Sequence, residues 1–122
     1  MSHKQVLVIE DDRSISEALS ELLQSEGYTV QTAFNGQEGL EILQNSNTLP
    51  CVILLDLMMP VKDGFQFRNE QLQNPKISGV PVVVMSADGH VQEKKARIGA
   101  LDYIRKPVDV ETYLKVVSRF CD

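Results

Sequence analysis

The sequence has little cysteine and no long hydrophobic run, and each shortage excludes a class of protein. Its only cysteines, Cys51 and Cys121, have no metal-ligand spacing, and so small a number favours two reduced thiols over a disulfide framework. No apolar run approaches the roughly 20 residues that a membrane span requires. The opening residues "MSHKQ" lead directly into an apolar segment without the pattern of a secretory signal. We therefore expect a cytoplasmic protein with no membrane role.

Positive charge is also scarce. Lysine and arginine number 12 against 17 aspartates and glutamates, so the formal net charge is −5 at pH 7. Beyond the short segment "EKKAR", residues 93–97, the basic residues form no stripe, which disfavours direct binding to nucleic acid. With 122 residues, of which 43% are hydrophobic, the chain has the length of one compact domain. We expect that single domain to occupy residues 1–122.

Short β-branched segments alternate with longer amphipathic segments, a pattern typical of βα units around a parallel sheet. Strands are expected over residues 5–9, 28–33, 51–55, 80–86 and 101–104. The first, third and fourth of these are continuously apolar, which indicates that helices cover both of their faces. Helices are expected over residues 14–26, 36–45, 65–73, 91–98 and 110–120. The sequence thus predicts an α/β fold with a five-stranded sheet.

The segment "VILLDLMMP", residues 52–60, places one carboxylate in a run that is apolar enough to be buried. An ionised aspartate inside a packed core costs on the order of several kcal/mol. We therefore expect the strand to stop at Asp56, so that this side chain lies at the carboxyl end of the sheet, where parallel sheets place their ligand sites. An isolated aspartate at a strand end is most often only a turn former, so the assignment depends on its neighbours.

Other polar residues also follow the predicted strands: Glu10 and Asp11 after the first, Ser86 at the end of the fourth and Lys106 after the fifth. Because parallel strands end at the same edge, these side chains should meet Asp56 there. Clustered carboxylates either share a proton or hold a divalent cation, and hard oxygen ligands favour Mg²⁺, with Mn²⁺ as an alternative. A metal with open positions beside a lysine and a hydroxyl group predicts a site for phosphoryl chemistry.

Four fragments contain the predicted site residues, in the order "VLVIEDD", "LLDLMMPVKDG", "VVVMSA" and "GALDYIRKP". Together they resemble the receiver domain of two-component response regulators. Each fragment is weak alone, but the four in this order are specific, and the resemblance covers nearly the whole chain. It implies the flavodoxin-like (βα)5 fold, a three-layer sandwich around a five-stranded parallel sheet.

The resemblance also implies a role for each matched residue. Asp56 would be the phospho-acceptor, Asp11 a direct metal ligand and Glu10 a metal-site acid that acts through water. The backbone carbonyl of Met58 would complete the protein's share of the metal ligands. The neighbouring Asp12 stays outside this site, since an acid in the first turn of a helix is favoured by the helix dipole alone.

Two further roles concern the phosphoryl group and the response to it. Ser86 and Lys106 would contact the phosphoryl oxygens, and Tyr103 would be the aromatic residue whose rotamer reports phosphorylation. The donor would be a sensor histidine kinase or a phosphotransfer protein. A downstream protein partner would bind the face made by residues 91–98, 101–104 and 110–120. The resemblance therefore implies a phosphorelay switch that modifies itself, rather than an enzyme with turnover.

The same residues bear on three other functions. A Mg²⁺-dependent phosphohydrolase of the haloacid dehalogenase type also forms an aspartyl phosphate, but it needs an acid two residues after the nucleophile, where this chain has Met58. A flavin-binding electron carrier needs a loop rich in Ser, Thr and Gly after the first strand, and that loop here reads "EDDRS". A receiver-like module that never takes phosphate is disfavoured by the complete set of acceptor, acids and lysine. The chain is either a stand-alone receiver or a fragment of a longer regulator.

Overall fold

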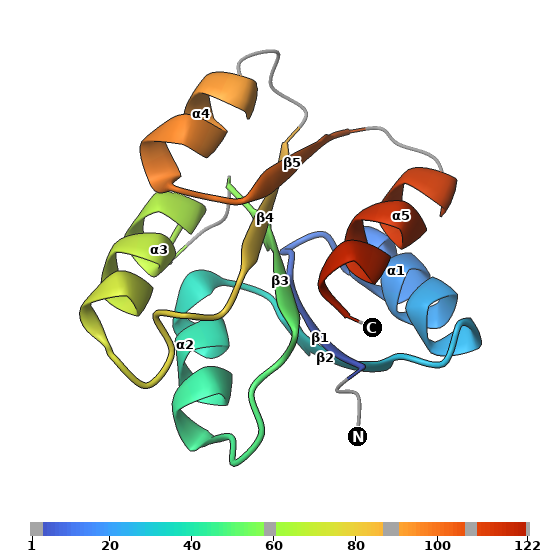
Figure 1. Ribbon diagram of the computed structural model, residues 1–122, viewed down its shortest axis with the longest axis horizontal. Coiled ribbons are helices and arrows are strands. Elements are labelled where there is room, and N and C mark those ends of the chain that lie inside the picture. Colours follow the sequence, from blue (N-terminus) through green and yellow to red (C-terminus); the bar gives the residue numbers. More distant parts are fainter. Residues whose placement is uncertain (1–3, 58–60, 87–90, 107–109, 122) are drawn as a thin grey trace.

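A parallel β-sheet lies between two layers of helices in the computed structural model, which describes residues 4–57, 61–86, 91–106 and 110–121 (Figure 1). The strands are β1 (Gln5–Ile9), β2 (Thr29–Ala33), β3 (Val52–Asp56), β4 (Val82–Ser86) and β5 (Asp102–Arg105). The helices are α1 (Arg13–Ser25), α2 (Gly36–Asn45), α3 (Gly64–Gln73), α4 (Val91–Ile98) and α5 (Val110–Phe120). Helices α1 and α5 cover one face of the sheet, and α2, α3 and α4 cover the other (Figure 1). The predicted flavodoxin-like (βα)5 sandwich is confirmed.

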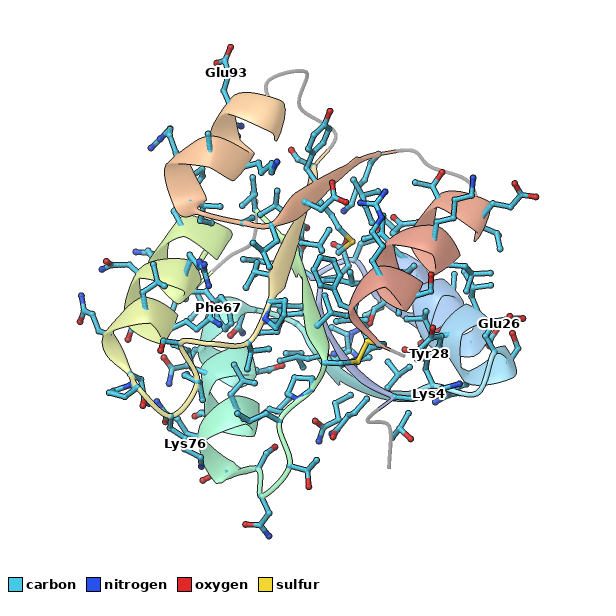
Figure 2. The ribbon with its side chains drawn as sticks, viewed as in Figure 1. Lys4, Glu26, Tyr28, Phe67, Lys76 and Glu93 are labelled. Atoms are coloured by element: carbon cyan, nitrogen blue, oxygen red, sulfur yellow. A yellow bond between two sulfur atoms is a disulfide. The ribbon has the colours of Figure 1, made fainter. Side chains whose placement is uncertain are left out.

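The sheet has the strand order β2-β1-β3-β4-β5, so the three continuously apolar strands are internal. Alternate side chains of these strands feed two separate cores, as the period of two in a β-strand requires. Leu7, Ile9 and Leu55 face α2, α3 and α4, where the fully buried Phe67 of α3 joins them (Figure 2). Val8 and Leu54 face α1 and α5. Burial on both faces explains why these strands lack polar residues until their ends.

The fourth strand begins later than the sequence predicted. It starts at Val82, not at Val80, because Pro81 has no N–H group to donate to the neighbouring strand. The carbonyl oxygen of Pro81 still accepts a hydrogen bond from the backbone N–H of Ile53, at 2.9 Å. The proline therefore fixes where β4 joins β3.

Polar side chains begin three helices directly after the loops that leave the carboxyl ends of strands. Asp12 caps α1 by accepting a hydrogen bond from the backbone N–H of Ile15, at 3.2 Å. Asn35 caps α2, and Asp63 caps α3 in a reciprocal capping box with Gln66. Each cap satisfies backbone N–H groups that the first helical turn leaves without partners. The caps let the chain turn from a strand into a helix within a few residues.

A disulfide bond joins Cys51 and Cys121, so the prediction of two reduced thiols is wrong (Figure 2). The two Cα atoms lie 5.3 Å apart, within the usual range for a disulfide. Helix α5 runs back from the carboxyl edge of the sheet, so its end reaches the residue just before β3. Because the two cysteines are 70 residues apart, the sequence gives no sign that they are neighbours.

In the part of the chain that the structure describes, no helix has both the length and the apolar character to cross a bilayer.

Among the described residues other than glycine, one has a positive φ, and it lies in the connection between β3 and α3. Val61 has a φ of 67°, in the left-handed region that β-branched residues rarely adopt, and its side chain is 79% exposed. Such a conformation costs roughly 1–2 kcal/mol in a residue with a Cβ atom. The exposed valine side chain gains little packing in return.

Replacing Val61 by glycine should therefore stabilise the protein. We expect Val61→Gly to raise the free energy of unfolding by about 1 kcal/mol, because glycine adopts positive φ without strain and part of that gain is lost to its freedom in the unfolded chain. Val61→Ala keeps the Cβ atom and should gain less. Urea unfolding midpoints of the three proteins measure the effect. A lower midpoint for Val61→Gly would contradict the assignment of strain to this residue.

Candidate functional site

Four polar residues lie where β1, β3, β4 and β5 end, at the carboxyl edge of the sheet. Glu10 directly follows β1, and its backbone N–H continues the pairing with β2 by donating to the carbonyl of Ala33, at 3.0 Å. Asp56 and Ser86 are the last residues of β3 and β4. Lys106 follows β5, and its backbone N–H donates to the carbonyl of Ser86, at 2.8 Å. The backbone of the sheet therefore fixes the positions of all four residues.

Three carboxylates come together at this edge. Glu10, Asp11 and Asp56 each offer an oxygen atom, and these atoms lie within 4.8 Å of one another. Asp11 is exposed, whereas Glu10 is 1% and Asp56 6% exposed. Mg²⁺ binds oxygen ligands at about 2.0–2.1 Å, so oxygens on opposite sides of it are roughly 4 Å apart. The spacing and the hard oxygen donors both fit a divalent cation.

Lys106 supplies the positive charge of the site. Its ammonium group donates a hydrogen bond to Oε1 of Glu10, and its Nζ lies 3.6 Å from Oδ2 of Asp56. Burial alone would lower the pKa of Lys106, but the hydrogen bond to Glu10 and the charges of Asp56 and Glu10 outweigh it and raise the pKa above the usual value. Lys106 is therefore charged at neutral pH. It neutralises one of the three carboxylates, and the remaining negative charge attracts a cation.

Of the other predicted site residues, Ser86 lies in β4 and Tyr103 in β5, and Met58 falls outside the described part of the chain. Ser86 is 3% exposed, and it lies one residue beyond Met85, which pairs in register with Asp56. Tyr103 lies in β5, partly buried against the core on the side of α2, α3 and α4, and Nζ of Lys95 is 6.0 Å from the centre of its ring. Met58 lies outside the described residues.

Asp12, next to Asp11 in the sequence, has a structural role. Asp12 does not belong to the carboxylate group, because its side chain caps α1, in agreement with its placement outside the site. Its backbone N–H donates to Oε2 of Glu10, at 3.2 Å, which helps to orient that carboxylate. Gly64, after the cap Asp63, has no room for a side chain, since a Cβ atom would lie 2.9 Å from Cα of Leu57. The start of α3 therefore packs tightly against Leu57, the residue after β3.

The sequence analysis did not include Tyr113, which lies in the helix expected over residues 110–120, among the site residues. This tyrosine and Lys106 line a cavity of about 320 Å³ between α1 and α5, together with Val110 and the α1 residues Ile15, Ala18, Leu19 and Leu22. Burial raises the pKa of Tyr113, Lys106 lowers it, and Glu10 and Asp56 raise it further. Its hydroxyl group therefore stays protonated near the site. The sequence feature that could have pointed to Tyr113 is a tyrosine among the aliphatic residues of an amphipathic helix.

Comparisons with known proteins agree on one family. Residues 6–118 match the family model of the response regulator receiver domain. Protein PilH of Pseudomonas aeruginosa is 31% identical over 116 residues, a match that covers 93% of this chain and 94% of that protein. The DNA-binding dual master transcriptional regulator RpaA of Synechocystis is 37% identical over 112 residues, a match that covers 90% of this chain. The chain spans only 46% of the length of RpaA.

Solved structures show the same likeness. The chemotaxis protein CheY4 of Vibrio cholerae superposes with a TM-score of 0.87 at 30% identity, covering 98% of this chain and 99% of that one. The response regulator protein TrrA of Thermotoga maritima, solved in complex with Mg²⁺ and BeF, has a TM-score of 0.83 at 28% identity. That match covers 96% of this chain and 98% of TrrA.

The carboxylate group should repel itself when no metal is bound. We expect Asp11→Asn to raise the free energy of unfolding by roughly 0.5 kcal/mol in metal-free buffer at low salt, a modest gain because Asp11 is exposed. Saturating Mg²⁺ should then stabilise the parent protein more than the variant. Glu17→Gln, on the exposed face of α1, removes the same charge elsewhere and serves as the control. An Asp11→Asn protein that is less stable without metal would contradict the repulsion.

Loss of Lys106 should have the opposite effect on stability. We expect Lys106→Met to cost about 2 kcal/mol at pH 7, because it leaves the buried Glu10 and Asp56 without their positive partner. The deficit should shrink as the pH is lowered from about 7 to about 5, because a buried carboxylate without a counter-charge gains from protonation. Denaturant unfolding of both proteins across this range measures the difference. A deficit that is constant over the range would show that Lys106 acts through packing alone.

Proposed function

Because the chain belongs to the response regulator receiver family, we propose that it is a phosphorylation-controlled switch in which Asp56 accepts the phosphoryl group. The observation that carries this proposal is the place of Asp56 at the end of the central strand. There it meets two other carboxylates, and Nζ of Lys106 lies 3.6 Å away. Residues 1–122 would act as one receiver domain located in the cytoplasm.

Glu10, Asp11 and Asp56, with the backbone carbonyl of Met58, would hold Mg²⁺, and Mn²⁺ would serve in its place. Asp11 is exposed and suits a direct ligand, whereas Glu10 is already bonded to Lys106 and suits contact through a water molecule. When bound, the metal neutralises charge on the transferred phosphoryl oxygens. The donor set supports this choice, because all of its ligands are oxygen atoms.

In the proposed reaction a phosphoryl group passes from a phosphohistidine to Asp56. A carboxylate oxygen of Asp56 attacks the phosphorus of a phosphohistidine on a histidine kinase or phosphotransfer protein. As the new O–P bond forms, the N–P bond breaks and the imidazole leaves with the electron pair. Lys106 and Ser86 would bind the phosphoryl oxygens of the resulting acyl phosphate. Attack by water later releases inorganic phosphate and restores the carboxylate.

The output would follow from a change in population between two conformations. A phosphoryl group bound by Ser86 would draw that hydroxyl toward Asp56, and Tyr103 of the neighbouring strand would move into the space that it leaves. Tyr103 lies in β5 and Ser86 in the neighbouring strand β4, so the face made by α4, β5 and α5 would change its affinity for a downstream protein partner. Direct contact with nucleic acid or a membrane is not part of the proposal, given the net charge of −5.

The main alternative is a Mg²⁺-dependent phosphohydrolase that forms the same aspartyl phosphate. It would need a further acid to activate water and a binding site for its substrate. The three clustered carboxylates, Glu10, Asp11 and Asp56, would all serve the metal site, and the neighbouring Asp12 caps α1. We therefore favour a receiver that catalyses its own modification and is not a turnover enzyme.

Replacing the acceptor tests the proposal. With acetyl phosphate and Mg²⁺, intact-mass measurement should show one added phosphoryl group on the parent protein, no addition without a divalent cation, and at least a 100-fold loss of labelling in Asp56→Asn. Asp12→Asn is a matched control, because it removes a neighbouring acid and asparagine still caps α1. It should keep full labelling. Equal labelling of Asp56→Asn and the parent protein would overturn the assignment of Asp56.

A further inference from the structure

The disulfide between Cys51 and Cys121 connects the start of β3 to the end of α5. Cys51 directly precedes β3, the strand that ends at Asp56, and Cys121 directly follows α5 (Figure 2). Helix α5 also carries Tyr113, which lies beside Lys106 at the opposite edge of the sheet. The bond therefore links the start of β3 to the carboxyl end of α5, and the amino-terminal part of α5 lies beside the site.

Few other directed interactions hold the end of α5. Among the described residues, Arg119 forms an ion pair with Asp102, but the arginine side chain is 64% exposed and such pairs contribute little. The backbone N–H of Cys121 donates within the helix, to the carbonyl of Val117. The apolar face of the helix, including Val116 and Val117, packs against the core. Loss of the disulfide would thus remove the covalent anchor from the last turn.

The site of Cys51 also accommodates the reduced state. Its sulfur lies 3.0 Å from the carbonyl oxygen of Gln5, at the start of β1. In the disulfide this sulfur carries no hydrogen, but as a thiol it would donate a hydrogen bond to that oxygen. Cys51 is only partly buried, whereas Cys121 is 1% exposed, so Cys51 is the more accessible residue of the pair. Reduction therefore creates no unsatisfied donor at Cys51.

From these contacts we propose that Cys51 and Cys121 form a reversible redox switch, which clamps α5 to β3 when oxidised and releases the end of α5 when reduced. A thiolate of a dithiol protein of the thioredoxin class attacks the Cys51 sulfur, the bond to Cys121 breaks, and the second thiol of the reductant resolves the mixed disulfide. Two electrons and two protons pass to the cysteine pair, and the reductant becomes a disulfide. Disulfides of proteins in reducing compartments are usually of this transient kind.

Unfolding and hydrogen exchange test the proposal, and neither depends on phosphorylation of Asp56. Reduction of the parent protein by a small dithiol should lower the thermal midpoint by roughly 10 °C, because the cross-link closes a long loop in the unfolded chain. Amides in the last two turns of α5 should exchange at least 10-fold faster, while those of β1 and β3 stay protected. Oxidised glutathione should restore both properties.

A double variant provides the control. Cys51→Ser/Cys121→Ala keeps a donor for the carbonyl of Gln5 and places no polar group at the buried position, so it should fold and behave like the reduced parent protein. The dithiol should not alter its midpoint. The proposal is overturned if the parent protein's two thiols remain open to alkylation after treatment with oxidised glutathione. Equal exchange of α5 in the two redox states would also overturn it.

Discussion

The burial of two carboxylates against one ammonium group is the constraint on which the rest of this site depends. The side chains of Glu10 and Asp56 are almost fully buried. Burying either carboxylate as an ion without a counter-charge would cost on the order of several kcal/mol of folding free energy. Lys106 bonds to the first and lies near the second, and the backbone of β4 holds it there through the carbonyl of Ser86. The contacts of Lys106 thereby connect the ends of β1, β3, β4 and β5. Disturbing one of these strand ends disturbs the counter-charge of the others.

The sheet makes this unit possible because it brings the strand ends together without regard to their distance in sequence. In the order β2-β1-β3-β4-β5, β1 and β4 flank β3, so the acids of β1 approach Asp56 from one side and Ser86 lies on the other. Parallel pairing places the carboxyl ends of these strands at a common edge. One lysine cannot balance three carboxylates, and the remaining negative charge makes this edge attractive to a cation.

The strands of the sheet, and most of the residues that meet at its carboxyl edge, could be predicted from the sequence. Asp56 interrupts a buried apolar run, and such a run tolerates a carboxylate only at its end, so both the strand boundary and the site follow from one residue. Cys51 and Cys121 show the limit of this reasoning. Their partnership arises from the path of α5 across the sheet, and no local pattern in the sequence encodes that path. Tyr113 was missed because periodicity gives the buried face of a helix but not which of its side chains lies beside Lys106.

The dual contact of Lys106 also explains how a modification at Asp56 could affect the whole edge. In the resting state the ammonium group is shared between Glu10 and Asp56, with the hydrogen bond going to Glu10. In the proposed phosphorylated state the negative charge on Asp56 would increase and move outward onto the phosphoryl oxygens. Lys106 would then be drawn from Glu10 toward the new anion, because a charge-assisted hydrogen bond to phosphate is the stronger interaction. Glu10 would be left to the metal ion, so binding of the cation and retention of the phosphoryl group would favour each other through the same lysine.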